Sequence, residues 1–154
     1  MEALTVALNY CVERDRSRQW EVFLKVFAAE ISREAPAEEL RGLMRRLGRA
    51  MAGVLNLDAA ESLGDFERVA NDYWQEMGWG WVQLVEQPDH LLVQHYGAPL
   101  RVAFGDEALA WTPALLEGLY EEWLRSLGAP ESLRLRQHDV SGDGLLMQYQ
   151  LAKS

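Results

Sequence analysis

The sequence predicts an α+β fold in which a helical N-terminal half packs on an antiparallel sheet of about four strands. Apolar residues recur every three or four positions through most of the first half and again after residue 112, which is the spacing of amphipathic helices. Residues 79–96 and 133–151 instead alternate apolar and polar residues on either side of a turn, as β-hairpins do. We expect a single domain over residues 1–154, made of two hairpins with one long helix between them.

Charge is predicted to interrupt the N-terminal segment. The run Arg14-Asp-Arg-Ser-Arg18 separates residues 1–16, which are expected to form a mobile arm or a short helix, from the next apolar stripe. That stripe, at positions 20, 23, 24, 27 and 31, predicts a helix with one apolar face.

Two more helices are predicted before the first hairpin. Proline favours the first turn of a helix, so Pro36 is expected to open the first of them, whose apolar stripe continues to Val54. Asp65 is expected to cap the second, because its carboxylate can accept hydrogen bonds from free N–H groups of the first turn. Gly78 and Gly80 mark the end of that helix.

The spacing then changes from that of a helix to that of a strand. Residues 79–86 and 90–96 predict the two strands of a hairpin, joined at Pro88-Asp89. Residues 97–110 are rich in glycine and proline and are expected to be largely loop, with a short edge strand at 100–104.

The last part of the chain predicts a helix and a second hairpin. Thr112 is expected to cap the helix and Pro113 to open it, and Gly128 ends it. Residues 133–138 alternate apolar and basic side chains, and residues 145–151 alternate again, which predicts two strands joined by a turn.

The composition excludes several classes of partner. The formal net charge of −9 repels a polyanion, so we expect no nucleic-acid partner. A single cysteine, Cys11, cannot form an internal disulfide. The N-terminal residues lack the basic start of a secretory signal, so we expect a cytoplasmic location, with the periplasm as the alternative.

No pattern predicts catalysis, a metal or a cofactor. The segment Asp139-Val-Ser-Gly-Asp-Gly144 begins like a calcium loop, but Gln150 stands where such a loop needs a glutamate, so we interpret it as a turn. His90 and His95 lie an odd number of residues apart on one strand and face opposite sides; with His138, they are expected at the surface.

Paired carboxylates need weighing, because glycosidases use two of them. Glu117 and Glu121 share one helix face, and Glu86 and Asp106 are further candidates. We interpret the Glu117 face as the outer, solvated face of its helix, where such pairs arise by chance in an acidic protein.

Three tryptophans supply candidate binding surfaces. Trp79, Trp81 and Trp111 lie at the ends of predicted elements, where an aromatic ring can pack in the core, serve a subunit interface or stack on a sugar. For each of the three, core or interface is favoured over contact with a ligand.

Three arginines form a row at one-turn spacing along one predicted helix: Arg41, Arg45 and Arg49. The row is a candidate site for an acidic partner, and its alternative interpretation is a solvated helix face.

Several segments together resemble the bacterial cellulose synthase operon protein D family. They are Met77-Gly-Trp-Gly80 before an apolar strand, the helix Trp111-x-Pro-x-Leu-Leu-Glu-Gly-Leu-Tyr-x-x-Trp123, the arginine and glycine helix Leu43–Met51, and the last strand Leu145–Leu151. The resemblance runs from about Trp20 to Leu151 in the family's order, whereas residues 1–16, 97–110 and Gly80-Trp81 depart from its pattern.

The resemblance implies a non-catalytic accessory protein of cellulose export that associates with the membrane-bound synthase and needs no cofactor. Family members form a ring-like homo-octamer built from dimers, and glucan chains are thought to pass through channels at the subunit interfaces. The implied partners are copies of the chain itself, the β-1,4-glucan and other cellulose synthase subunits. Because the N-terminal segment lines the channel in the family, Tyr10 joins the three tryptophans as a glucan-binding or interface candidate.

Three hypotheses follow. The first is an oligomeric subunit that guides nascent β-1,4-glucan for export and crystallisation. The second is a protein–protein adaptor of the synthase complex that never contacts glucan. The third, an acidic glycoside hydrolase, is supported by scattered carboxylates alone.

Overall fold

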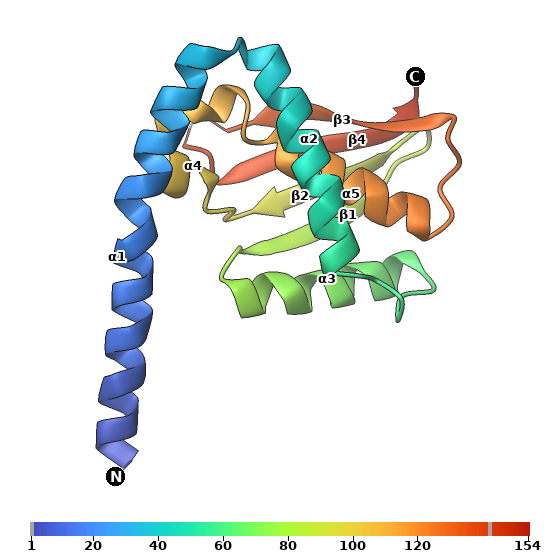
Figure 1. The fold of residues 1–154 in the computed structure, drawn as a ribbon. Helices are drawn as coiled ribbons and strands as arrows, with labels where there is room; N and C mark the ends of the chain where they lie inside the picture. Colours follow the sequence, from blue (N-terminus) through green and yellow to red (C-terminus); the bar gives the residue numbers. More distant parts are fainter. Residues whose placement is uncertain (1, 142) are drawn as a thin grey trace.

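The computed structural model describes residues 2–141 and 143–154, with side chains described except at residues 2 and 8–19. In chain order the elements are α1 (Glu2–Glu34), α2 (Ala37–Val54), α3 (Leu63–Met77), β1 (Trp81–Glu86), β2 (Leu91–Tyr96), α4 (Leu100–Phe104), the 3-10 helix η1 (Asp106–Ala110), α5 (Ala114–Ser126), β3 (Leu133–Val140) and β4 (Leu146–Lys153). The strands form one antiparallel sheet in the order β1-β2-β4-β3 (Figure 1). The predicted α+β fold, with a helical N-terminal half and two hairpins, is confirmed.

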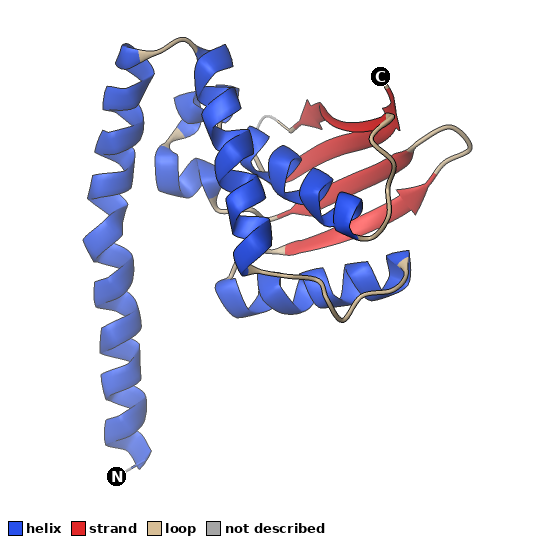
Figure 2. Ribbon diagram, turned by 45° about the vertical axis from the view of Figure 1, so that its right-hand side comes forward, coloured by secondary structure: helices blue, strands red, loops and turns tan. Residues whose placement is uncertain are grey.

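Helices gather on one face of the sheet. Helix α3 lies against β1, α5 lies against β3, and α2 packs on α5 (Figure 2). Because side chains alternate along a strand, every second residue reaches this helical layer. Val82, His95 and Met147 are register partners on three neighbouring strands, and all three are buried there. The residues between them point to the opposite face.

Two glycines allow α2 and α5 to approach closely. A Cβ atom on Gly48 would lie 2.7 Å from the backbone nitrogen of Leu119 and still closer to the carbonyl oxygen of Leu115. A Cβ atom on Gly118 would lie 2.8 Å from the carbonyl carbon of Arg45. Backbone therefore meets backbone at this crossing, and neither position has room for a larger residue.

Side chains of the helices cover both edges of the sheet. At the β1 edge, the Asn71 amide bonds both the N–H and the carbonyl of Val82, at 2.7 and 3.0 Å, and Glu67 accepts from the Leu84 N–H. At the β3 edge, Glu121 accepts from the Leu135 N–H and Glu117 from the N–H of Gln137, two residues further along the strand. These four edge N–H groups are thus satisfied inside the chain.

Helix α1 is longer than predicted. It continues from Glu2 to Glu34 through the run at 14–18 that was expected to break it. Residues 2–34 contain neither glycine nor proline, and most of their charged side chains favour the helix, so charge alone does not stop it. The N-terminal half of α1 stands away from the other elements, while its C-terminal end lies beside α4 (Figures 1 and 2).

The segment 97–110 is helical, which corrects the predicted loop and edge strand. It forms α4 and η1, with Leu100 and Ala108 buried. A strand at 100–104 would need a free sheet edge, and both edges are already covered. A short helix instead places Leu100 in the core beside α1.

Two predicted helix caps were wrong by a few residues. Ser62 caps α3: its Oγ accepts from the Asp65 N–H at 3.1 Å, while the Asp65 carboxylate accepts from the Glu61 N–H at 3.2 Å. Asp65 is therefore the third-position partner of a capping box. Thr112 does not cap α5, because its hydroxyl donates to the Ala108 carbonyl at 2.9 Å, and the helix begins after Pro113.

Candidate interaction surfaces

An aromatic row lies exposed on α1. Trp20, Phe23 and Phe27 follow one another on one side of the helix, with ring centroids 5.7 and 6.0 Å apart, and each is about half exposed (46–55 %). Water-facing aromatic rings in a continuous row are costly for a solitary protein and typical of an interface. We call these three residues the aromatic row.

An apolar groove adjoins the aromatic row between α1, α2 and α4. Its volume is about 590 Å³, and the lining side chains are almost all apolar. They include Phe27 of the aromatic row, Ile31 of α1, Leu47 of α2 and the indole rings of Trp79 and Trp111. The groove and the row therefore form one continuous apolar surface.

The accessible surface of the chain is larger than its mass requires. It measures 9555 Å² for 17.5 kDa. A compact monomer of this mass exposes roughly 7,900 Å² by the usual scaling of surface with mass. Helix α1 projects from the rest of the chain (Figure 1), and this projection enlarges the exposed surface. The same helix carries the exposed aromatic row.

The outer face of the sheet carries a second aromatic surface. Trp81 of β1 and Tyr96 of β2 are register partners whose rings stack at 5.3 Å with planes 12° apart. Trp81 is 55 % exposed. Gln83, Gln94 and Gln148 continue the same face as register partners across three strands. Flat rings beside a row of amides can stack on a sugar ring and hydrogen-bond its hydroxyl groups.

The structure separates the four glucan-binding or interface candidates. Trp81 lies on the outer sheet face, whereas Trp111 is buried and donates from Nε1 to Ser32 at 3.2 Å. Trp79 is partly buried, and its ring stacks on Trp74 at 5.6 Å. The side chain of Tyr10 lies outside the described residues.

Glu117 is buried, which corrects its assignment to a solvated helix face. It is 5 % exposed and accepts from Arg41 Nη2 at 3.1 Å, from Arg45 Nε and from the Gln137 N–H at 2.7 Å. Glu121 is 9 % exposed and accepts from the Leu135 N–H at 2.8 Å. Their charges hold α2, α5 and β3 together, so neither is positioned as a free catalytic acid.

The three arginines of α2 therefore have different roles, because two of them bond Glu117 and the third does not. Arg41 and Arg45 point to Glu117, and Arg41 also donates to the Gln137 amide oxygen at 2.7 Å. For these two residues the interpretation as a solvated face was wrong. Arg49 is exposed, one turn further along.

A signal for the burial of these carboxylates existed in the sequence. The stretch Ala114–Tyr120 is apolar on all sides except at Glu117, and a helix that is apolar all round is buried. A glutamate inside such a helix needs a charged partner.

His95 is fully buried, which corrects its assignment to the surface. Its Nε2 lies 2.7 Å from the Trp79 carbonyl oxygen, which only accepts, so Nε2 carries the proton. Nδ1 then accepts from the Tyr120 hydroxyl at 2.5 Å. Burial away from water lowers the pKa of His95 to about 4, so the ring is neutral at physiological pH.

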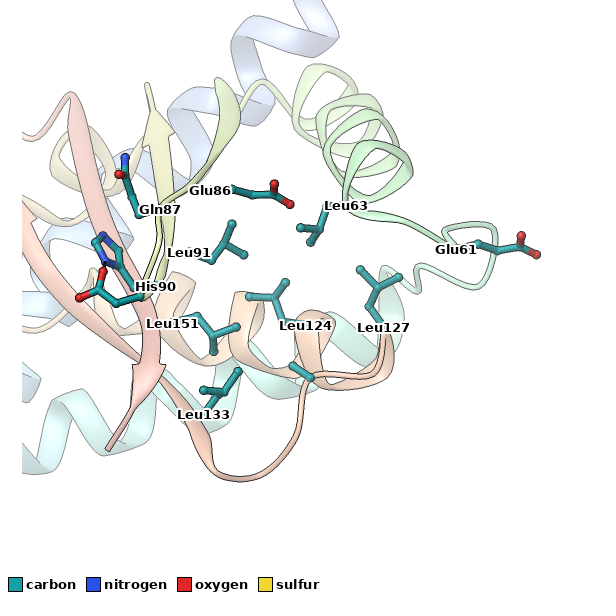
Figure 3. A pocket seen from close by; sticks show the side chains of 12 residues that line it. Glu61, Leu63, Glu86, Gln87, His90, Leu91, Leu124, Leu127, Leu133 and Leu151 are labelled. Carbon is teal, nitrogen blue, oxygen red and sulfur yellow. Dashed lines mark hydrogen bonds and ion pairs between the residues drawn. The ribbon is translucent and has the colours of Figure 1, made fainter.

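A separate pocket lies between the start of α3 and the turn that joins β1 to β2 (Figure 3). Its volume is about 630 Å³. Leucines from α3, α5 and the sheet form the floor, Glu61 and Glu86 stand at the rim, and Asp89 also lines the pocket. Among the described residues that line it there is no phenylalanine, tyrosine or tryptophan, so it offers no platform for a sugar ring.

The described residues contain no group of three or more histidine, cysteine, aspartate or glutamate side chains placed to hold a metal ion. The turn expected at Asp139–Gly144 begins two residues later, because Asp139 and Val140 still pair with β4 beyond a bulge; its Gly142 lies outside the description. Among the helices described, none is both long and apolar enough to cross a bilayer.

Comparison with known proteins identifies the family. Residues 6–150 match the family model that describes the D subunit of cellulose synthase. A cellulose synthase operon protein D of Komagataeibacter xylinus is 28 % identical over 107 residues, which are 68 % of this chain and 69 % of that protein, and one of Komagataeibacter sucrofermentans gives the same values. Another from K. xylinus is 25 % identical over 133 residues, 85 % of either chain. With nearly its whole length matched, the chain belongs to the cellulose synthase operon protein D family.

Proposed function

We propose that the protein is a non-catalytic, self-assembling accessory subunit of bacterial cellulose biosynthesis that guides nascent β-1,4-glucan chains. Membership in the cellulose synthase operon protein D family supports the role in cellulose biosynthesis, since its relatives carry the name of the same operon. The observation that carries self-assembly is the exposed aromatic row of α1 beside the apolar groove.

A second copy of the chain is the occupant that this apolar surface fits best. The aromatic row projects from the body on a long helix, and the groove offers an apolar concavity about 590 Å³ in volume. In a symmetric dimer, each α1 reaches the groove of its partner, and both surfaces leave water together. Dimers joined in this way would form the homo-octamer that the family resemblance implies.

Contact with glucan is assigned to the outer face of the sheet. A sliding polymer needs repeated, shallow contacts rather than a deep pocket. Trp81 and Tyr96 supply a flat platform, and the glutamines beside them supply neutral donors and acceptors for hydroxyl groups. Because this surface is repeated in every copy within a symmetric oligomer, one sequence provides several equivalent tracks.

The paired carboxylates of α5, Glu117 and Glu121, support a non-catalytic role. Glu117 uses both oxygens on two arginines and a backbone N–H, and Glu121 accepts a backbone N–H at a sheet edge. A glycosidase needs two carboxyl groups that face the substrate. These two instead face the interior of the fold.

Two measurements on the full chain test the proposal. Multi-angle light scattering at micromolar concentration is expected to give a multiple of the 17.5 kDa chain, and the mass of a monomer would contradict self-assembly. Isothermal titration with cellohexaose is expected to show binding that Trp81→Ala weakens about five- to tenfold, the loss of one stacked ring. Val102→Ala, which removes an exposed apolar side chain from α4, is the matched control and should bind normally.

The alternative is an adaptor that joins subunits of the synthase complex without contacting glucan. The arginines near Glu117 favour a protein partner of this kind. Retention of synthase subunits in a pull-down, with no binding of cellohexaose or cellulose, would establish the adaptor and refute glucan guidance.

A further inference from the structure

A second polar site lies between α2, α5 and β3, at the β3 edge of the sheet, apart from the apolar groove and from the Trp81 and Tyr96 platform on β1 and β2. It is a pocket of about 210 Å³ lined by four arginines and two glutamates. Arg45 and Arg49 come from α2, and Arg134 and Arg136 come from β3. The two elements are far apart in the sequence, so the fold itself assembles the pocket, which we call the arginine pocket.

The carboxylates in the arginine pocket do not balance its positive charge. Four arginines line the pocket together with Glu117 and Glu121, which leaves an excess of two positive charges. Arg41 also bonds Glu117 from the side, so the excess in the surrounding cluster is larger. This excess stands out in a chain with a formal charge of −9.

The bonds inside the pocket leave two arginines available. Arg45 is held by Glu117 through its Nε, and Arg134 lies 3.8 Å from Glu121. Within the part of the chain that the structure describes, Arg49 and Arg136 have no hydrogen-bond acceptor and no carboxylate at ion-pair distance, and both are exposed. The buried glutamates thus hold Arg45 and Arg134 in place, whereas the guanidinium groups of Arg49 and Arg136 are free to bind a ligand.

The size and shape of the pocket limit its ligand. Sites for nucleotides and other cofactors occupy about 300–1,000 Å³. The arginine pocket is smaller, and fits one or two carboxylate groups. A guanidinium group offers a planar fork of two N–H donors that matches a carboxylate, and it binds one with two parallel hydrogen bonds.

We propose that the arginine pocket binds the carboxylate side chains of an acidic segment in a partner protein. Arg49 and Arg136 contact the carboxylates of the partner directly. Arg45 is held in place by Glu117 and forms part of the pocket lining. The inference deepens the proposed accessory function, on which it rests, by naming the chemistry of one protein contact. It is separate from glucan binding, because the Trp81 and Tyr96 platform lies on β1 and β2, whereas Arg136 lies on β3 at the other edge of the sheet and Arg49 lies on α2.

Fluorescence anisotropy with a labelled peptide of alternating glutamate and glycine tests this inference on the full chain. The wild-type protein should bind it, and the same peptide with glutamine in place of glutamate should not bind. The double variant Arg49→Gln/Arg136→Gln is expected to weaken binding about tenfold, since two exposed ion pairs together contribute about 1.4 kcal/mol. Arg33→Gln/Arg68→Gln, which removes two exposed arginines elsewhere, is the matched control.

Three outcomes would overturn the inference: equal binding of the glutamate and glutamine peptides, unchanged binding by Arg49→Gln/Arg136→Gln, or tight binding of inorganic phosphate with no affinity for the peptide. The double variant should fold normally, because neither arginine side chain makes a hydrogen bond or an ion pair with another described residue. Its cellohexaose affinity and particle mass are measured beside the anisotropy. If the cellohexaose affinity and the particle mass of the double variant match those of the wild type, and the wild-type protein does not bind the peptide, the inference fails and the glucan-guiding function stands.

Discussion

Replacement of Gly48 by alanine tests the close crossing of α2 and α5. Two effects oppose each other at this position. Alanine stabilises a helix interior by about 1 kcal/mol relative to glycine. The new Cβ atom, however, would lie 2.7 Å from the Leu119 nitrogen and closer still to the Leu115 carbonyl oxygen, both of which belong to the backbone of α5.

The packing effect should win. Non-bonded heavy atoms rest at about 3.5 Å or more, so the two helices must separate by roughly 1–1.5 Å. Overpacking costs about 1–3 kcal/mol, and the upper end applies because a backbone cannot rotate out of the way. Separation also stretches the bonds of Glu117 to Arg41 and Arg45. The net loss in unfolding free energy should be about 2 kcal/mol.

Urea unfolding followed by circular dichroism measures this loss, at one protein concentration because self-association contributes to stability. Gly53→Ala on the same helix is the matched control. A Cβ atom there meets nothing within 4 Å, so this variant should be about 1 kcal/mol more stable than wild type. If Gly48→Ala is as stable as Gly53→Ala, the claim that α2 and α5 meet backbone to backbone at Gly48 is refuted.

Three further predictions concern charge, burial and assembly. His95 has a pKa of about 4 in the folded chain and 6.5 in the unfolded chain, so the unfolded chain binds the proton more tightly. The free energy of unfolding therefore falls as the pH drops below about 6.5. Between pH 7 and pH 5, urea titrations should show a loss that is about 2 kcal/mol larger for the wild type than for His95→Gln. Glu117→Gln should lower the free energy of unfolding by about 3 kcal/mol, because two arginines lose their carboxylate partner. The control Glu122→Gln, on the exposed side of α5, should change it by no more than about 0.5 kcal/mol. Equal shifts in the melting temperatures of the two variants would count against the buried cluster. Phe23→Ser/Phe27→Ser should shift the particle mass toward that of the single chain without loss of helical circular dichroism, and an unchanged mass would place the interface elsewhere.

The periodic parts of the fold were predictable because local spacing decides them. The apolar stripe of α2 and the alternation of both hairpins depend on which face of an element is buried, and a sequence records this directly. The charged run Arg14–Arg18 predicts a break, but it contains no helix-breaking residue, so α1 continues through it. The helix at Leu100–Phe104 was missed because sheet edges become covered only after α3 and α5 have docked.

The candidate site was predictable in its residue types but not in its partners. Trp81 and Trp111 both occur at the ends of elements, yet one stacks on the outer face of the sheet and the other lies in the core. The arginine row was visible as a one-turn spacing, but Arg136 joins it only through the pairing of β3 with β4 and the packing of α5. Contacts between elements distant in the chain carry no local signal.

The covered borders of the sheet have a consequence for crowded conditions. A strand with free amide groups can recruit a strand from any neighbouring molecule and template a growing fibril. Here Asn71 and Glu67 close one border, and Glu117 and Glu121 close the other. Many copies can therefore concentrate at one place in the cell without polymerising strand to strand, and their association is left to side chains that select a defined partner.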